Sequence, residues 1–230
     1  MRIQPWFPLV GLAAVLAAPL AASAAEADRL REAAAVVREL RSAPDRGIPE
    51  ELWEDADCIV VIPSMKKAAF VFGGEYGRGM MSCRNQTGWS APLFMQLAKG
   101  SWGLQIGAEA VDLVMLVMNR RGVESLLDNK VSLGVDASVA AGPVGRTGRA
   151  ATDAALNAQI LSYSRSKGLF AGIDLSGGVL RPDTDGNEDF YKRRVVARDV
   201  LFGPATTTDV AARDFTSALG TRAPAPTTGR

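Results

Sequence analysis

The chain has 230 residues, 47% of them hydrophobic and 22% charged, with 26 lysines and arginines against 25 acidic residues. That length and hydrophobic content suffice for one well-buried domain and exclude disorder as the dominant state, and 23 glycines disfavour an all-helical bundle. The absence of histidine excludes histidine-based triads, histidine proton shuttles and most catalytic metal sites, and two cysteines are too few for an iron–sulfur cluster.

Residues 1–25 have the pattern of a secretory signal peptide. Arg2 precedes an apolar run over residues 6–22 that contains two prolines and ends in the string Ala22-Ser23-Ala24, which predicts cleavage after Ala24 or after Ala25. The alternative is an uncleaved membrane anchor, for which the run is short. We therefore expect a periplasmic or secreted protein, peripheral at most to an envelope membrane.

Removal of residues 1–25 takes away one arginine and no acid, which lowers the net charge from +1 to zero. A neutral chain has no global field that attracts nucleic acid, so we expect no nucleic-acid partner. Export also places Cys58 and Cys83 in an oxidising compartment, where they can form a disulfide worth about 3 to 4 kcal/mol of loop entropy. The alternative is two small buried side chains in facing strands.

Residues 26–42 predict an amphipathic helix that ends before Pro44. Its apolar positions recur at helical spacing, with arginines and glutamates on the rest of the wheel. Such a stripe can lie on a membrane, but more often it packs on the domain's own sheet. The stripe consists of Leu30, Ala33, Ala34, Val37 and Leu40.

After this helix we expect a short helix over 49–54 and a strand over 58–62 that Pro63 ends. Short connections between the later strands predict antiparallel hairpins, and the clearest alternation of apolar and polar residues, over 131–140, predicts a strand with one buried face. The other predicted elements are strands over 70–72, 80–84, 94–97, 102–108, 112–118, 159–164 and 169–180, and helices over 121–129, 188–201 with Asn187 as its cap, and 210–219. We expect one domain over 26–203 and a mobile tail over 204–230.

The glycine-rich string Gly73-Gly74-x-x-Gly77-x-Gly79 invites comparison with phosphate-binding loops. A dinucleotide-binding loop needs a strand before it and a helix after it, whereas the residues that follow here are strand-like. We therefore expect these glycines to mark positions where strands kink or cross closely.

The acidic string from Asp183 to Asp189 suggests calcium, but its spacing departs from that of an EF-hand loop. The required glycine is fourth rather than sixth, and Arg194 stands at the twelfth position, where a glutamate is needed. A turn followed by a helix cap explains the string better, so we predict no metal and no cofactor.

The string Ser164-Arg165-Ser166-Lys167 has the S-x-x-K spacing of serine acyl enzymes, but the companion Ser-Asp-Asn and Lys-Thr-Gly triplets are absent. We therefore expect a polar strand end and no enzyme. Basic residues also cluster locally, and several on one face beside exposed apolar residues attract anionic head groups by about 1 kcal/mol each. These clusters are Lys66-Lys67, Arg146 with Arg149, Arg165 with Lys167, and Lys192-Arg193-Arg194.

Five sequence blocks in order resemble the SYLF domain family, over about residues 30–203. They are Val61-Ile62-Pro63, the segment from Lys67 to Gly79, Gly88-Trp89-Ser90-Ala91-Pro92, the segment from Ala140 to Arg146, and the segment from Ser162 to Gly172. The resemblance implies a lipid-binding domain, whose eukaryotic members bind phosphoinositides and related anionic phospholipids largely through an N-terminal amphipathic helix with basic residues. Fungal members also associate with actin.

In this chain Leu30, Arg31, Val37, Arg38, Leu40 and Arg41 stand at the place of that helix, and Glu32 and Glu39 dilute its charge. The resemblance therefore implies anionic phospholipids other than phosphoinositides as the ligand, and an exported protein of bacterial type is not expected to meet actin.

We expect an α+β fold: a bent antiparallel sheet or partly closed β-barrel, covered by the N-terminal helix and a C-terminal helix. The predicted function is non-catalytic phospholipid binding at the envelope, with Lys66 and Lys67 as additional phosphate contacts. One alternative is an envelope scaffold that binds a protein partner through glycine-rich strand edges. Another is a hydrolase with an unrecognised site.

Overall fold

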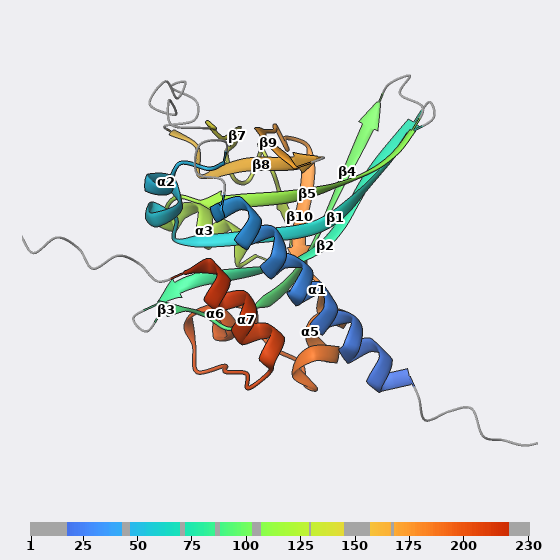
Figure 1. The fold of residues 1–230 in the computed structure, drawn as a ribbon, viewed down its shortest axis with the longest axis vertical. Coiled ribbons are helices and arrows are strands. Elements are labelled where there is room, and N and C mark those ends of the chain that lie inside the picture. Colours follow the sequence, from blue (N-terminus) through green and yellow to red (C-terminus); the bar gives the residue numbers. More distant parts are fainter. Residues whose placement is uncertain are drawn as a thin grey trace, which may run out of the picture.

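One strongly curled sheet organises the chain in the computed structural model, which describes residues 18–42, 47–69, 72–85, 88–102, 107–128, 130–144, 157–166 and 168–220. The ten strands of the described part run in the order β6-β10-β4-β2-β1-β5-β8-β7, with β3 beside β2 and β9 beside β8 (Figure 1). Every pair is antiparallel except β7 with β8. The expected α+β fold with a bent, partly closed sheet is confirmed.

The strands are β1 (Cys58–Ala69), β2 (Phe72–Asn85), β3 (Gly88–Trp89), β4 (Leu93–Trp102), β5 (Gly107–Val117), β6 (Val131–Ser132), β7 (Val139–Ala141), β8 (Ile160–Ser166), β9 (Leu169–Gly172) and β10 (Gly178–Pro182). The helices are α1 (Ala18–Ser42), α2 (Glu50–Asp55), α3 (Arg120–Leu126), α5 (Thr184–Tyr191), α6 (Ala197–Phe202) and α7 (Val210–Leu219).

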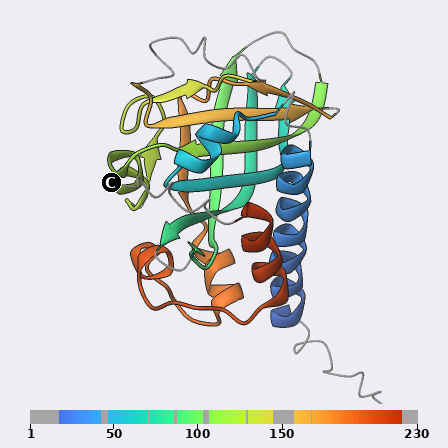
Figure 2. The ribbon, with the colours of Figure 1, turned by 60° about the vertical axis from the view of Figure 1, so that its left-hand side comes forward.

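The two faces of the sheet carry two separate cores. Along β1, Ile59 and Val61 join the core beneath α1, α2 and α7, while Val60 and Ile62 join the core on the other face, with α3 and α6. This division follows from the two-residue period of a strand, which sends alternate side chains to opposite faces. Figure 2 shows α1 running along the sheet with α7 beside it.

Helix α1 begins at Ala18, eight residues before the predicted start, and therefore includes the end of the predicted signal peptide. Residues 1–17, which hold the rest of that segment, lie outside the described residues. Within the described part, no helix combines the length and the apolar character that a membrane crossing requires.

Strand β1 does not end at Pro63, as the sequence suggested, but continues to Ala69. The pairing with β5 shifts register between Ile62 and Met65 and the pairing with β2 shifts between Val61 and Lys66, and Ser64 takes a left-handed φ of 51°. The backbone N–H of Ser64 donates to the carboxylate of Asp112 at 2.9 Å. A bulge thus accommodates the proline, because the extra residue finds a side-chain partner in the neighbouring strand.

The predicted strand over 131–140 is wrong, since the structure has two short strands there with a turn between them. Gly134 has a φ of 87°, and the carboxylate of Asp136 accepts a hydrogen bond from the backbone N–H of Ser132 at 2.7 Å. Val135 consequently lies in the turn and is 83% exposed. The glycine permits the positive φ that the turn requires.

The predicted helix over 188–201 with Asn187 as its cap is also wrong. Asp183 caps α5 by accepting from the backbone N–H of Gly186, and Asn187 lies within the helix. The amide of Asn187 exchanges hydrogen bonds with the backbone of Phe94, at 2.9 Å and 2.8 Å. Lys192, in the left-handed region with a φ of 56°, ends α5, and α6 starts at Ala197.

Two long predicted strands are divided in the structure. The prediction over 102–108 covers the end of β4 and the start of β5, and residues 103–106 between them lie outside the described residues. The prediction over 169–180 covers β9 and β10, with Gly177 at a φ of 81° between them. Residues 70 and 71 of the predicted strand over 70–72 also lie outside the described residues.

The segment after residue 203, expected to be a mobile tail, contributes α7 to the core. This helix spans the predicted residues 210–219, and Phe215 and Leu219 are fully buried beneath α1. The expected domain boundary at 203 is therefore too early by at least 17 residues of described chain.

The glycine-rich segment lies in β2, which pairs with β1 on one side and β4 on the other. A Cβ at Gly79 would lie 2.0 Å from the carbonyl oxygen of Val61, and one at Gly77 would lie 2.5 Å from Ile62. These two glycines allow a close approach of strands, as the sequence predicted, and none of the group borders a helix N-terminus.

Candidate functional site: cationic surfaces around the C-terminal helices

The apolar residues proposed for lipid contact on α1 are part of the protein core. Leu30 and Val37 are 0% exposed and Leu40 is 3% exposed, in the cluster that also contains Phe215 and Leu219 of α7. Of the two interpretations of this stripe, packing on the domain's own elements is therefore the one that the structure shows. The apolar face of α1 is not presented to solvent.

The basic residues of α1 each have an acidic partner. Arg31 pairs with Asp28 at 2.5 Å, Arg38 pairs with Asp214 of α7, and Arg41 pairs with Glu50 of α2 at 3.0 Å. Paired cations attract a distant anionic surface less, because the partner cancels most of the charge beyond the pair. The outer face of α1 is therefore weak as a cationic surface.

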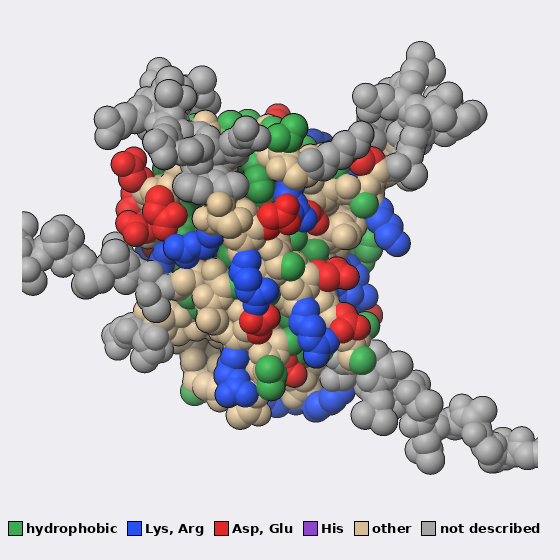
Figure 3. Space-filling view, viewed as in Figure 1, with side chains coloured by type: hydrophobic (Ala, Val, Ile, Leu, Met, Phe, Trp, Pro, Cys, Tyr) green, Lys and Arg blue, Asp and Glu red, His purple; other side chains and the backbone are tan. Residues whose placement is uncertain are grey.

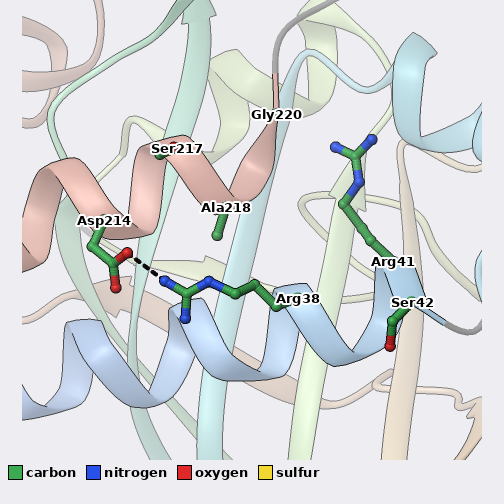
Figure 4. Close-up of a pocket in the computed structure, with 7 residues that line it drawn as sticks. All are labelled: Arg38, Arg41, Ser42, Asp214, Ser217, Ala218 and Gly220. Carbon is green, nitrogen blue, oxygen red and sulfur yellow. Dashed lines mark hydrogen bonds and ion pairs between the residues drawn. The ribbon is translucent and has the colours of Figure 1, made fainter.

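A groove of about 590 Å³ lies where α1 and α7 end, and Arg38 and Arg41 line it (Figure 4). Figure 4 shows Arg38 reaching toward Asp214, while Arg41 points toward the end of α7. Arg41 donates to the backbone carbonyl of Leu219 at 2.8 Å, and the hydroxyl of Ser42 donates to the carbonyl of Glu39. Both helices present their negative C-terminal ends here, so the groove disfavours an anion.

Lys66 and Lys67 lie in the second half of β1, which Figure 1 shows extending away from the helices. Lys66 is exposed, and the ammonium of Lys67 lies 3.8 Å from the carboxylate of Glu75. The structure therefore does not bring the two lysines together with the basic residues of α1. Their contribution to lipid binding stays a prediction.

Cys58 and Cys83 are directly opposite in the β1–β2 pairing, are fully buried and are joined as a disulfide. The cross-link joins β1 and β2, which lie in the middle of the strand order of the sheet. Its place in the core indicates a structural role.

The acidic string that suggested calcium is engaged in helix capping and ion pairing. The carboxylate of Asp183 accepts from Arg78 at 2.6 Å, and Arg78 has a raised pKa chiefly because of that hydrogen bond. Within the described residues no group of three or more metal-ligating side chains occurs. Nearby, burial raises the pKa of Glu26 above its ordinary value, although Arg29 and Arg78 oppose the shift.

The S-x-x-K string also has a structural explanation for the part that is described. Ser166 donates to the carboxylate of Glu109 at 2.6 Å, and Arg165 binds Asp112 and Glu39, which ties β8 to β5 and α1. Lys167, Arg146 and Arg149 lie outside the described residues.

A different set of cations lies between α5 and α7, and we call it the C-terminal surface. Three apolar side chains are exposed there: Val196 by 61%, Phe202 by 47% and Val210 by 70%. Figure 3 shows lysine and arginine side chains, interspersed with hydrophobic and acidic ones, in the lower part of the molecule. The surface consists of Lys192, Arg193, Arg194, Val196, Arg198, Phe202, Val210 and Arg213, all of them exposed.

Three arginines of the C-terminal surface have no acidic partner within the described part of the chain: Arg193, Arg198 and Arg213. Arg194 differs, since it pairs with Glu188 at 2.8 Å. The sequence analysis identified residues 192–194 as a basic cluster. Because it predicted one continuous helix over 188–201, it did not group this cluster with residues of α6 and α7. On α6, Arg198 and Phe202 are four residues apart and so share one side of the helix.

Comparison with known proteins identifies a family. Residues 98–222 match the family described as Ysc84, Las17-binding protein actin regulator. LAS seventeen-binding protein 3 of Saccharomyces cerevisiae is 34% identical over 163 residues, which cover 69% of this chain and 35% of the yeast protein. SH3 domain-containing YSC84-like protein 1 is 33% identical over 180 residues in Homo sapiens (75% of this chain, 52% of that protein) and 33% identical over 183 residues in Bos taurus (76% and 53%).

The chain thus spans about a third to a half of the length of these relatives. The matched segment continues past residue 203 and includes α7, in agreement with the packing of that helix. The SYLF resemblance inferred from the sequence blocks is confirmed, and the chain belongs to the Ysc84 (SYLF) family.

Proposed function

We propose that this chain is a non-catalytic lipid-binding protein of the cell envelope, which binds anionic phospholipids through its C-terminal surface. The observation that carries the proposal is the combination of exposed Val196, Phe202 and Val210 with arginines that have no acidic partner among the described residues. A peripheral membrane protein needs both parts, because apolar side chains enter the interface while cations hold it close to anionic head groups.

The magnitudes favour this surface over α1. Each cation close to an anionic membrane contributes about 1 kcal/mol, so three unpaired arginines contribute about 3 kcal/mol, or roughly a hundredfold in affinity. The three arginines on α1 that were expected to contribute in the same way are paired with Asp28, Glu50 and Asp214. Insertion of an exposed apolar side chain adds about 0.8 kcal/mol for each buried methylene group.

Vesicle sedimentation tests the proposal. The protein should bind vesicles of phosphatidylglycerol and phosphatidylcholine and should not bind vesicles of phosphatidylcholine alone. We expect Arg193→Gln with Arg198→Gln to weaken binding by at least tenfold. The matched control is Arg121→Gln with Lys130→Gln, which removes two exposed cations without acidic partners from another part of the described surface. Equal losses in both double variants, or no binding by the folded wild type, would overturn the proposal.

The envelope location is a separate part of the proposal and depends on the predicted signal peptide. Fractionation of cells that express the whole chain, followed by N-terminal sequencing, should recover the protein outside the cytoplasm with Ala25 or Glu26 as its first residue. Recovery of an intact N-terminus from the cytoplasm would overturn this part alone.

The description of the matched family, Las17-binding protein actin regulator, and the name of the yeast relative support a protein partner as the second candidate. The route expected from the sequence, through glycine-rich strand edges, does not match the fold, because β2 pairs on both sides. The described strands at the two ends of the sheet, β6 and β7, have two and three residues. Strands so short offer few backbone groups for an added strand.

A further inference from the structure

A cleft of about 320 Å³ opens between α6, α7 and the segment that leads from β2 into β4. Its volume is at the lower end of the range of small-molecule sites, which suits a polar head group of a few heavy atoms. The lining residues are Asn85, Trp89, Ser90, Ala91, Pro92, Val200, Gly203, Ala205, Thr206, Thr207, Ala212, Arg213 and Thr216.

Arg213 is the one charged residue among those that line the cleft. Its guanidinium has no hydrogen bond or ion pair with any described residue, in contrast to Arg38 and Arg41 in the groove at the ends of α1 and α7. The geometry of α7 explains this difference: Asp214 points toward α1 and pairs there, while Arg213 and Thr216, three residues apart, line the cleft on the other flank.

The rest of the cleft combines hydroxyl groups with apolar walls. Thr207 accepts from the backbone N–H of Asp209 at 3.1 Å, so its hydroxyl hydrogen stays available to donate, whereas Thr216 donates its hydroxyl hydrogen to the carbonyl of Arg213 at 3.1 Å. Thr206 has no hydrogen bond to a described side chain or backbone group. Pro92, Val200 and Ala205 supply apolar contact.

We propose that this cleft binds the phosphate ester of a single phospholipid head group, with Arg213 as the partner of the phosphate. A guanidinium presents a planar fork of N–H donors that matches two phosphate oxygens, and the hydroxyls of Thr206 and Thr207 can donate to the remaining oxygens. None of the described residues that line the cleft is an acid that could compete for the arginine. The inference rests on the proposed function, since it names the ligand chemistry of one part of the C-terminal surface. It adds saturable binding of one head group to the electrostatic attraction between the arginines and an anionic membrane.

Two measurements separate the cleft from the surface around it. The first is titration with sn-glycerol 3-phosphate, and with inorganic phosphate, followed by the NMR signal of the Trp89 indole N–H, which is held by a hydrogen bond to the carbonyl of Gly220 at 2.6 Å. The second is sedimentation with phosphatidylglycerol vesicles. Arg213→Gln is compared with Arg198→Gln, which removes an equal charge from the C-terminal surface outside the cleft.

We expect glycerol 3-phosphate to shift the Trp89 signal saturably and to bind more tightly than inorganic phosphate. Arg213→Gln should weaken that binding about tenfold, the loss of one charge-assisted contact, while Arg198→Gln changes it less than twofold. Both variants should weaken vesicle binding. Vesicle binding by the wild type without any Trp89 response, or an equal response in Arg213→Gln, would overturn the cleft and leave the proposed function intact. Glycerol 3-phosphate binding without vesicle binding would overturn the assignment to a lipid.

Discussion

The guanidinium of Arg41 donates a hydrogen bond of 2.8 Å to the backbone carbonyl of Leu219, 178 residues further along the chain. The indole N–H of Trp53 donates to the same carbonyl at 3.1 Å, and that of Trp89 donates to the carbonyl of Gly220 at 2.6 Å. The last carbonyls of a helix have no partner within the helix. Three side chains from α1, α2 and β3 therefore satisfy the end of α7 and fix it to the domain.

Replacement of Arg41 by methionine should lower the free energy of unfolding by about 1 to 2 kcal/mol, because it removes a hydrogen bond from a charged donor to a carbonyl. Arg31→Met is the matched control, since Arg31 pairs with Asp28 on the exposed surface, where such pairs contribute below about 1 kcal/mol. Urea unfolding followed by tryptophan fluorescence measures both. Equal effects of the two variants would show that Arg41 does not clamp α7.

The lipid-contact role predicted for the apolar residues of α1 is the part of the sequence prediction that the fold does not support, and the reason is the position of α7. An apolar stripe such as Leu30, Val37 and Leu40 has the same spacing whether it faces a membrane or a core. In this protein the stripe faces the core, because Phe215 and Leu219 of α7, near the other end of the chain, pack against it. The helical spacing of 210–219 predicted α7 itself correctly, but spacing carries no information about the partner of a helix.

The errors in secondary structure have two sources, a local turn and a contact between residues far apart in the chain. The alternation of apolar and polar residues over 131–140 predicted one strand in spite of Gly134 and Asp136. These two residues form a turn, in which Gly134 takes a positive φ and the carboxylate of Asp136 accepts a hydrogen bond from the backbone N–H of Ser132. Asn187 has the side chain of a helix cap, but its amide binds the backbone of Phe94, 93 residues away. The helices α2 and α7 were predicted within one residue of their observed bounds, whereas several strands were predicted too short or as one strand where the structure has two.

Replacement of Leu30 by alanine tests the assignment of α1 to the core. Leu30 is 0% exposed, so its truncation should lower the free energy of unfolding by about 2 to 5 kcal/mol. Leu169→Ala, at a position that is 61% exposed, should change it by less than about 0.5 kcal/mol. Below its unfolding temperature the Leu30 variant should bind anionic vesicles as the wild type does. A Leu30→Ala variant that is as stable as the wild type but no longer binds vesicles would show that α1 contacts the membrane instead of the core.

The pH dependence of stability should contain a contribution from Glu26. Burial raises its pKa above the ordinary value of 4.5 in the folded state, so the folded protein binds this proton more readily than the unfolded chain. The stabilising contribution is complete below that ordinary value and is lost as the pH rises through the folded pKa. Arg29 and Arg78 limit the shift, and Asp183 and Asp189 add to it.

Glu26→Gln removes this titration and keeps the shape of the side chain. The variant should exceed the wild type in stability by the largest amount at neutral pH. That difference should shrink as the pH falls from 7 to 4. Thermal unfolding of both proteins across that range measures the difference. A difference in melting temperature that stays constant over the range would contradict the raised pKa.

The close approach of β1 and β2 should make Gly79 intolerant of any side chain. A Cβ at this position lies 2.0 Å from the backbone oxygen of Val61, and a backbone atom cannot move aside without breaking the sheet. Gly79→Ala should therefore yield little folded protein. Gly74→Ala in the same strand is the control, because nothing lies within 4 Å of its Cβ. Soluble yield and circular dichroism compare the two, and a folded Gly79→Ala protein would show that the strands can separate.

Loss of the disulfide should destabilise the sheet through the unfolded state. Cys58 and Cys83 are 25 residues apart, and the constraint on a loop of that length is worth about 3 to 4 kcal/mol in the chain-entropy model. Substitution of both cysteines by alanine should lower the free energy of unfolding by about this amount, as measured by urea unfolding. Reduction of the wild type before unfolding should give a similar loss, because it releases the same loop without removing the buried side chains. If reduction has no effect while the alanine variant is destabilised, packing of the sulfurs rather than the cross-link stabilises the centre of the sheet.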